Sequence, residues 1–254
     1  MAEDTMKSLV RLFKVLEAMT EKEFNGVREL TAKTGINATS IYRMLSTMVK
    51  LGYIWQNPET EKYALTYKIT ALGNLVAIKN PIVNIVHPFL VELSTHFKAT
   101  AHFVEKVGNR CRYIDKVSPS EGVIATGSYI GMELPLTTTA VGKAMLSQRS
   151  IEEVTNIWNS EDVVVYTKNT ITDLERLLKE LEHSRKYGFG YDNEERENGL
   201  FCVAVSLNDF TLKDKYAISL SAPVAIMQGE YLEKVEGYLL KIKQEVSPLL
   251  GGIL

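Results

Sequence analysis

Apolar residues in the first part of the chain recur at intervals of three and four, which predicts helices that turn one face toward a common core. The first helix shows this repeat at Leu9, Leu12, Phe13, Leu16 and Met19. A short helix is expected from Val27 to Thr34, followed by a turn at Gly35 and a third helix that the N-cap Asn37 opens. The third helix carries the apolar stripe Ile41, Leu45, Met48 and Leu51, which we expect to face the core.

Two short runs of β-type residues follow these helices. Residues 53–56 and 62–65 flank Asn57-Pro58, a dipeptide that favours a turn, so we expect a hairpin. Three helices with a tight glycine turn before the third, followed by a hairpin, indicate a winged helix-turn-helix over residues 1–65. Double-stranded DNA is therefore the first partner to consider.

The polar face of the third helix carries hydroxyl, phenol and cationic side chains, and residues 36–55 contain no carboxylate. Such a face suits a major groove lined by phosphates, although a solvated helix face fits this helix alone equally well. The flanking elements favour DNA. The residues predicted to contact it are Asn37, Thr39, Ser40, Tyr42, Arg43 and Thr47 of the third helix and Lys62 of the hairpin.

The formal net charge of −2 hides an asymmetry between the two parts of the chain. Residues 1–79 hold 11 Lys and Arg against 8 Asp and Glu, a net of +3, whereas the remainder has 18 against 23, a net of −5. The basic part is thus the part with the predicted DNA-binding helix. Since +3 is modest, we expect dimerisation to double the phosphate contacts.

The chain beyond the hairpin changes character. Residues 66–78 have helical spacing and predict a linker helix, segment 66–79, which Asn80-Pro81 ends. A further helical stripe over residues 82–97 contains Pro88, which must either start that helix or kink it. Strands are expected at residues 100–107, 112–117, 163–166, 200–207 and 216–222, and helices at residues 154–158, 174–187 and 232–250. An α+β domain over residues 80–254, with helices packed on an antiparallel sheet, accommodates this pattern.

The two cysteines, Cys111 and Cys202, have no CxxC or Cys/His spacing around them, so neither a disulfide framework nor a zinc site is expected. We expect no metal and no cofactor. The N-terminus lacks an apolar signal region, and no apolar run approaches the ~20 residues of a membrane span. These features predict a cytoplasmic protein with reduced thiols and no membrane partner.

Segments in both parts of the chain resemble the IclR family of bacterial transcriptional regulators. The segments that carry the resemblance are residues 39–45, 51–54, 62–66, 131–146, 188–204 and 217–221, and the match spans almost the whole chain. The resemblance implies a winged helix-turn-helix, a linker helix and a GAF-like effector-binding domain. It further implies a ligand-responsive regulator of a catabolic operon, a repressor that binds a palindromic operator as a homodimer or homotetramer.

The run at residues 191–195, with residues 61–63 of the hairpin, looks most like members that control sugar-acid catabolism of the ketodeoxygluconate or pectin type. The resemblance therefore implies a small carboxylate effector, such as a sugar acid or a keto acid. By the same resemblance the effector-binding residues are Val123, Thr126, Leu134, Ala140, Val141, Asp192, Leu200, Cys202, Ser219 and Ser221. Thr126 departs from the family, where an apolar wall residue is common.

The residues themselves allow a similar reading of part of this set. Ala140 and Val141 could present backbone N–H groups at a helix start, where a carboxylate binds well, although an ordinary turn of small residues fits the spacing too. A strand's period of two puts Ser219 and Ser221 on one face, which could hold a polar ligand or face solvent. Asp192 would repel a carboxylate but can accept hydrogen bonds from ligand hydroxyls.

The sequence leaves three other functions to consider. A regulator that works through protein contacts without a small effector is consistent with all of it. An enzyme would use Cys202 as a thiolate nucleophile, but no sequence feature sets a base beside it, so we expect no enzymatic activity. A metal-dependent sensor could use Asp192, Cys202 and a histidine, yet these residues lack a diagnostic spacing.

Overall fold

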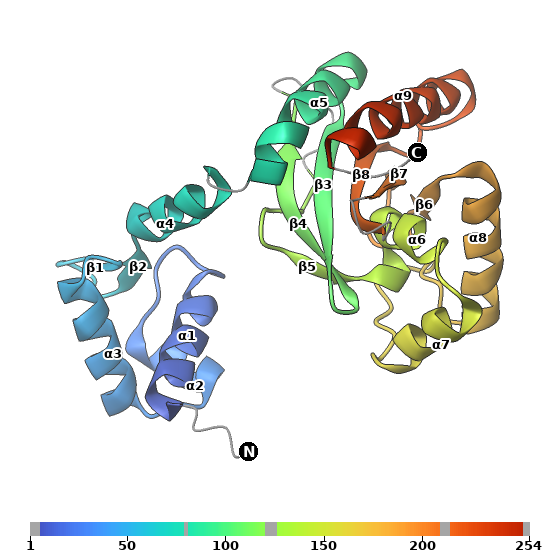
Figure 1. The fold of residues 1–254 in the computed structure, drawn as a ribbon. Helices are drawn as coiled ribbons and strands as arrows, with labels where there is room; N and C mark the ends of the chain where they lie inside the picture. The colour runs from blue at the N-terminus through green and yellow to red at the C-terminus, as the bar shows by residue number, and fades with distance from the viewer. Residues whose placement is uncertain (1–5, 79–80, 120–125, 209–213, 251–254) are drawn as a thin grey trace. The chain divides into compact units, whose positions relative to one another are not determined.

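The computed structural model describes residues 6–78, 81–119, 126–208 and 214–250, which form two compact units, Met1–Lys79 and Asn80–Leu254 (Figure 1). Val123, one of the predicted effector-binding residues, lies outside the described residues. Of the helices in the described ranges, none is both long enough and apolar enough to cross a membrane.

The N-terminal unit is a winged helix-turn-helix followed by one further helix, as predicted. Its elements are α1 (Lys7–Met19), α2 (Val27–Thr34), α3 (Ala38–Lys50), β1 (Ile54–Gln56), β2 (Tyr63–Leu65) and α4 (Tyr67–Ile78). Gly35 ends α2 in the left-handed conformation, with φ of +70°, which is the tight turn that brings α3 back across α2. β1 and β2 pair antiparallel and form the wing.

The core of this unit is smaller than the apolar stripes predict. Ile41, Leu45 and Met48 are buried, but Leu51 is 53% exposed because α3 ends at Lys50 and the chain turns away immediately afterwards. The stripe of the first helix is also only partly buried. Its buried face comprises Val15, Ala18 and Met19, whereas Leu9 and Phe13 are 48% and 61% exposed. The prediction that Leu51, Leu9 and Phe13 face this core was therefore wrong.

The C-terminal unit contains a six-stranded antiparallel sheet in the order β5-β4-β3-β8-β7-β6. The strands are β3 (Thr100–Val107), β4 (Arg110–Val117), β5 (Glu133–Pro135), β6 (Gly190–Asn193), β7 (Leu200–Asn208) and β8 (Asp214–Pro223). Helices α5 (Pro81–Phe97) and α9 (Gly229–Leu249) cover one face of the sheet (Figure 1). The other face carries α6 (Ala140–Leu146), α7 (Ile151–Asn159) and α8 (Leu174–Tyr187), with the short 3-10 turn η1 (Leu136–Thr138) before α6.

The alternation of side chains along the strands divides the interior into two apolar cores. Phe103, Val203 and Ile218 pack under α5 and α9, whereas their neighbours Val104 and Ala204 pack under α6. The sequence predicted this α+β architecture, and the fold class is confirmed. Every second residue of the central strands is consequently available to the α6 side.

The structure lacks one predicted strand, adds β5 and β6 to the predicted set, and decides between the two alternatives for Pro88. Residues 163–166 form no strand: Val164 and Val165 are exposed, and the backbone N–H of Tyr166 donates to the hydroxyl of Thr170 (3.0 Å) instead of to a neighbouring strand. The edge strands of the sheet are β5 and β6, and residues 163–166 pair with neither of them. Pro88 lies inside α5, so it does not start that helix.

Candidate ligand pocket and nucleic-acid interface

The outer face of α3 exposes most of the residues predicted to contact DNA. Those with exposed side chains are Thr39, Tyr42, Arg43 and Thr47, and Ser40 is half-buried beside them. The helix keeps its apolar residues inside, so this face presents a phenol, hydroxyls and a guanidinium with no carboxylate among them. Such a surface can donate to phosphates and to base edges.

Two further predicted residues have structural partners of their own. The side-chain oxygen of Asn37 accepts the backbone N–H of Ser40 (2.9 Å), so Asn37 holds the start of α3. The ammonium of Lys62, which precedes β2, lies 3.9 Å from a carboxylate oxygen of Glu29 on α2. The pair is exposed and long, so it leaves the Lys62 charge accessible.

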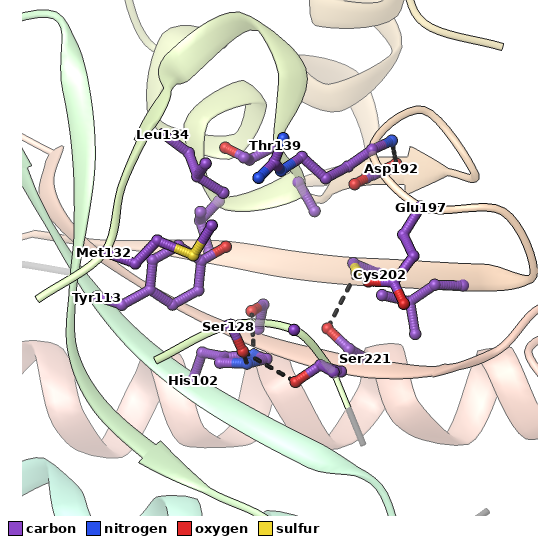
Figure 2. A pocket seen from close by; sticks show the side chains of 17 residues that line it. His102, Tyr113, Ser128, Met132, Leu134, Thr139, Asp192, Glu197, Cys202 and Ser221 are labelled. Atoms are coloured by element: carbon purple, nitrogen blue, oxygen red, sulfur yellow. Dashed lines mark hydrogen bonds between the residues drawn. The ribbon is translucent and has the colours of Figure 1, made fainter. Parts of the chain in front are cut away.

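A cavity of about 180 Å³ lies on the α6 side of the sheet in the C-terminal unit. Nine of the ten predicted effector-binding residues line it: Thr126, Leu134, Ala140, Val141, Asp192, Leu200, Cys202, Ser219 and Ser221. Figure 2 shows Tyr113, Met132 and Leu134 on one side of the cavity and Asp192 and Cys202 opposite them. The cavity therefore has an apolar side and a polar side.

The floor of the pocket is set by the register of four strands. Asp192, Cys202 and Ser221 are direct cross-strand partners on β6, β7 and β8, and Ser219 pairs with His102 on β3. The Ser221 hydroxyl donates to the Cys202 sulfur (3.0 Å), as Figure 2 shows. The sheet thus places two rows of polar side chains beneath the cavity, from residues far apart in sequence.

Helix α6 packs closely against β6 and against η1 because two glycines leave room for it. A Cβ on Gly190 of β6 would lie 2.2 Å from the carbonyl oxygen of Ala140, and one on Gly142 would lie 2.0 Å from that of Leu136. The hydroxyl of Thr139 caps α6 by accepting the N–H of Gly142 (3.1 Å). The first turn of α6, with Ala140 and Val141, is consequently held against the pocket.

Asp192 is a buried carboxylate with a fixed orientation. One of its oxygens accepts the backbone N–H groups of Glu195 (2.8 Å) and Arg196 (3.3 Å). Burial raises its pKa above the ordinary value, and the Lys143 ammonium, these two N–H groups and the Arg196 guanidinium counteract part of that rise. Lys143 is itself fully buried and forms an ion pair with Glu195. A ligand in the pocket would therefore contact a carboxylate whose negative charge is partly offset by neighbouring protein groups.

The wall around Thr126 is polar because of a hydrogen-bonded chain that sequence reasoning did not find. The Ser128 hydroxyl lies 2.8 Å from Nε2 of His102 and 2.8 Å from the Thr126 hydroxyl. The Lys116 ammonium donates to the carbonyl oxygens of Thr126 (3.1 Å) and Ser128 (2.6 Å). Burial, with a smaller contribution from Lys116, lowers the pKa of His102 to about 3, so this imidazole is neutral near pH 7.

The chemistry of Cys202 gives no support to the enzyme alternative. Burial raises the pKa of its thiol, and the neighbouring Asp192 carboxylate raises it further, so the sulfur stays protonated. The ring nitrogens of His102 lie against the hydroxyls of Ser128 and Ser219. Within the described ranges no three His, Cys, Asp or Glu side chains come together as metal ligands would.

Several lining residues were missed in the sequence: His102, Tyr113, Gly127, Ser128, Met132, Thr139, Arg196 and Glu197. His102 belongs to the predicted strand 100–107, and its place beside Ser219 follows only once β3 is paired with β8. Arg196 and Glu197 lie in the charge-dense loop before β7, whose composition is that of a solvated turn.

Comparison with known families settles which group of proteins this chain belongs to. Residues 75–248 match the family described as bacterial transcriptional regulator IclR C-terminal, and residues 8–58 match the IclR helix-turn-helix domain. The chain belongs to the IclR family. This IclR-family member is a DNA-binding transcriptional regulator rather than an enzyme.

Individual relatives match over nearly the whole chain. The HTH-type transcriptional regulator KdgR of Escherichia coli is 32% identical, covering 98% of this chain and 94% of its own. The DNA-binding transcriptional repressor YiaJ of E. coli is 31% identical, covering 96% and 88%. The crystal structure of the Thermotoga maritima IclR aligns with a TM-score of 0.81 at 28% identity, covering 97% of this chain and 100% of the other.

Proposed function

We propose that this IclR-family regulator is a cytoplasmic repressor of a catabolic operon that responds to a small hydroxylated acid of the sugar-acid class. The observation that carries the proposal is the cavity itself, because nine positions expected to bind an effector line it together. Its volume of about 180 Å³ is below the ~300 Å³ at which drug-sized sites begin, which suits a small metabolite.

The chemistry of the lining supports an acid with several hydroxyl groups. The first turn of α6 offers backbone N–H groups, which favour a carboxylate. Asp192, Ser219 and Ser221 offer acceptors and donors for hydroxyls, and the polar wall around Thr126 adds more. A keto acid with no hydroxyl groups would leave most of these partners unused. The 32% sequence identity to KdgR and the resemblance of residues 191–195 to sugar-acid regulators also support a sugar acid.

DNA binding would use α3 in the major groove and Lys62 of the wing on the adjacent backbone. The exposed Arg43 and Tyr42 are placed to reach base edges, while the hydroxyls of Thr39 and Thr47 suit phosphates. A single unit of this size covers one half-site. We therefore propose a palindromic operator bound by two copies of the chain.

Exposed apolar side chains in the N-terminal unit support the dimer. On α1 they are Leu9, Val10 and Phe13, and on α4 they are Leu72 and Leu75. Among the described residues they lie outside the apolar core of their own unit, and a second copy would cover them. Pairing through the effector domains would extend the dimer to a tetramer.

The proposal predicts a selective response to sugar acids. A thermal-shift screen of the full chain against sugar, keto and aromatic acids should yield stabilisation by one class, since a ligand that binds only the folded state stabilises it by mass action. The same acid should change operator affinity in a gel shift, by an amount that corresponds to about 1–3 kcal/mol of coupling. If all three classes leave the melting temperature unchanged, the regulator that works without a small effector becomes the better hypothesis.

A further inference from the structure

Arg196 is a cavity-lining cation to which the proposed function assigns no role. It lies in the loop between β6 and β7, four residues after Asp192, and it is one of the residues that line the pocket, as are Thr139 and Ala140. Its guanidinium stacks over the ring of Tyr166, with the central carbon 4.1 Å from the ring centroid. An Arg held on an aromatic face is oriented and partly desolvated.

Arg196 forms no close ion pair among the described residues, although its charge helps to lower the pKa of Asp192. Among the described residues, no carboxylate oxygen lies within 4.0 Å of its guanidinium nitrogens, whereas the buried Lys143 is committed to Glu195. Asp192 accepts the backbone N–H of Arg196 and not its side chain. Since His102 is neutral, Arg196 is the cation that the described lining offers to a ligand.

The carboxylates around the cavity disfavour some positions of a ligand anion. Asp192 and Glu197 also line the cavity, and a ligand carboxylate beside either one would be repelled. Beside Arg196 the same carboxylate could accept two parallel N–H bonds from the planar guanidinium. The hydroxyl-bearing part of the ligand would then face Asp192 and the serines of β8.

We propose that Arg196, positioned by Tyr166, binds the acid group of the effector and makes the regulator select acids over neutral sugars of the same shape. This inference rests on the proposed function, because it names the residue that would discriminate within the sugar-acid class. Arg196 would contact the ligand directly. Tyr166 is a positioning residue that acts through the guanidinium.

The test uses matched pairs of an acid and its neutral counterpart on the full chain. Isothermal titration would compare D-gluconate with D-glucitol and D-galacturonate with D-galactose, for the unmodified protein, Arg196→Gln and Arg196→Lys. We expect Arg196→Gln to weaken binding of the acid about tenfold or more and binding of the neutral counterpart less than about twofold. Arg196→Lys should weaken acid binding less than Arg196→Gln does, because it keeps the positive charge but loses the planar guanidinium that donates two parallel N–H bonds. Lys168→Gln, an exposed cation two residues from Tyr166, is the control and should bind as the unmodified protein does.

Failure of this inference can be told apart from failure of the proposed function. If the unmodified protein binds none of D-gluconate, D-galacturonate and 2-keto-3-deoxygluconate, the sugar-acid proposal fails and this inference fails with it. If it binds an acid and Arg196→Gln binds that acid equally well, this inference alone is wrong. An equal loss for the acid and the neutral sugar would also overturn it, because the effect would then be on pocket shape.

The role of Tyr166 is tested by keeping or removing its ring. Tyr166→Phe should leave acid binding within about twofold, whereas Tyr166→Leu should weaken it severalfold by releasing the guanidinium. The melting temperature without ligand should be the same for both variants, because the ring is only half-buried. A loss in Tyr166→Phe as large as that in Tyr166→Leu would contradict the positioning role.

Discussion

Lys143 and Glu195 form an ion pair in the interior of the C-terminal unit, between α6 and the loop that follows β6. The Lys143 side chain is 1% exposed, and the second oxygen of Glu195 is buried without a hydrogen-bond partner among the described residues. Burial raises the pKa of Glu195, and Lys143 opposes that rise. The pair stands directly behind Asp192, so its loss affects both stability and the pocket.

Breaking this pair should destabilise the protein strongly. Lys143→Met leaves Glu195 buried without its counter-charge, and we expect the free energy of unfolding to fall by about 3–5 kcal/mol in urea titrations. Lys179→Met, which removes an exposed pair with Glu175, is the control and should cost less than about 1 kcal/mol. The double variant Lys143→Met/Glu195→Leu should regain most of the loss. A double variant no more stable than the single one would show that the pair does not act as a unit.

Stability should fall on acidification because His102 is buried in its neutral form. Its folded pKa of about 3 lies below the unfolded value of about 6.5, so between these values the unfolded chain binds more protons and stability rises with pH. Above about pH 6.5 His102 is neutral in both the folded and the unfolded chain and does not lower the stability. Between pH 7 and pH 5 its protonation in the unfolded chain should lower the free energy of unfolding by about 2 kcal/mol.

The comparison with His102→Gln isolates this effect. Asp192 and Glu195 also have raised pKa values, which change stability in the opposite direction as pH rises through them, so the difference between the two proteins is the relevant quantity. We expect the variant to lose less stability than the unmodified protein between pH 7 and pH 5 in urea unfolding. Parallel pH profiles would exclude His102 as their cause.

Gly190 should tolerate no side chain. Its Cβ would meet the backbone of Ala140 and Ala144 on α6, which cannot move aside as a flexible side chain would, so Gly190→Ala should cost about 3 kcal/mol or more. Gly237 in α9 has open space around it, and Gly237→Ala should stabilise by about 0.5–1 kcal/mol. Melting temperatures should therefore shift in opposite directions. A Gly190→Ala protein as stable as the original would contradict the close approach of α6 to β6.

Arg43→Ala should weaken operator binding by about 1–3 kcal/mol if Arg43 contacts a base. The measurement is a gel shift with an operator obtained by selection, at fixed salt concentration because phosphate contacts make affinity salt-dependent. Lys179→Ala removes the same charge from the C-terminal unit and should bind normally. Normal operator binding by Arg43→Ala would rule out this docking of α3.

Asp192→Ala should spare operator binding but abolish the response to the effector. Asp192→Asn keeps an oxygen that can accept the N–H groups of Glu195 and Arg196, so it controls for collapse of the loop. We expect both variants to bind operator as the unmodified protein does and to lose the effector-induced shift in affinity. A full response in either variant would remove Asp192 from the effector site.

The sequence was sufficient for elements whose spacing is local. The helices Val27–Thr34 and Leu174–Tyr187 were predicted with the bounds that the structure has, because caps and glycine turns mark their ends. Residues 163–166 were misjudged because β-branched composition does not show whether a partner strand is available. Leu51 continued the apolar stripe of α3 in sequence, but the helix had already ended.

The residues that line the pocket likewise include some that were predicted from the sequence and some that were not. Family resemblance identified nine lining residues, whose binding role stays a prediction, whereas His102 and Arg196 were not found. The position of His102 depends on pairing with a strand more than a hundred residues later, and the direction of the Arg196 side chain depends on Tyr166 in a different loop. Such long-range relationships leave no local pattern in a single sequence.

The pocket floor and the pocket wall differ in what holds them. The floor residues Asp192, Cys202 and Ser221 are fixed by the backbone hydrogen bonds of the sheet, whereas the wall residues Thr126 and Ser128 belong to a loop held by side chains. A substitution in the wall therefore changes the shape and polarity of the cavity without disturbing the strands. Descendants of one ancestral regulator could acquire new chemical signals in this way while keeping the same scaffold.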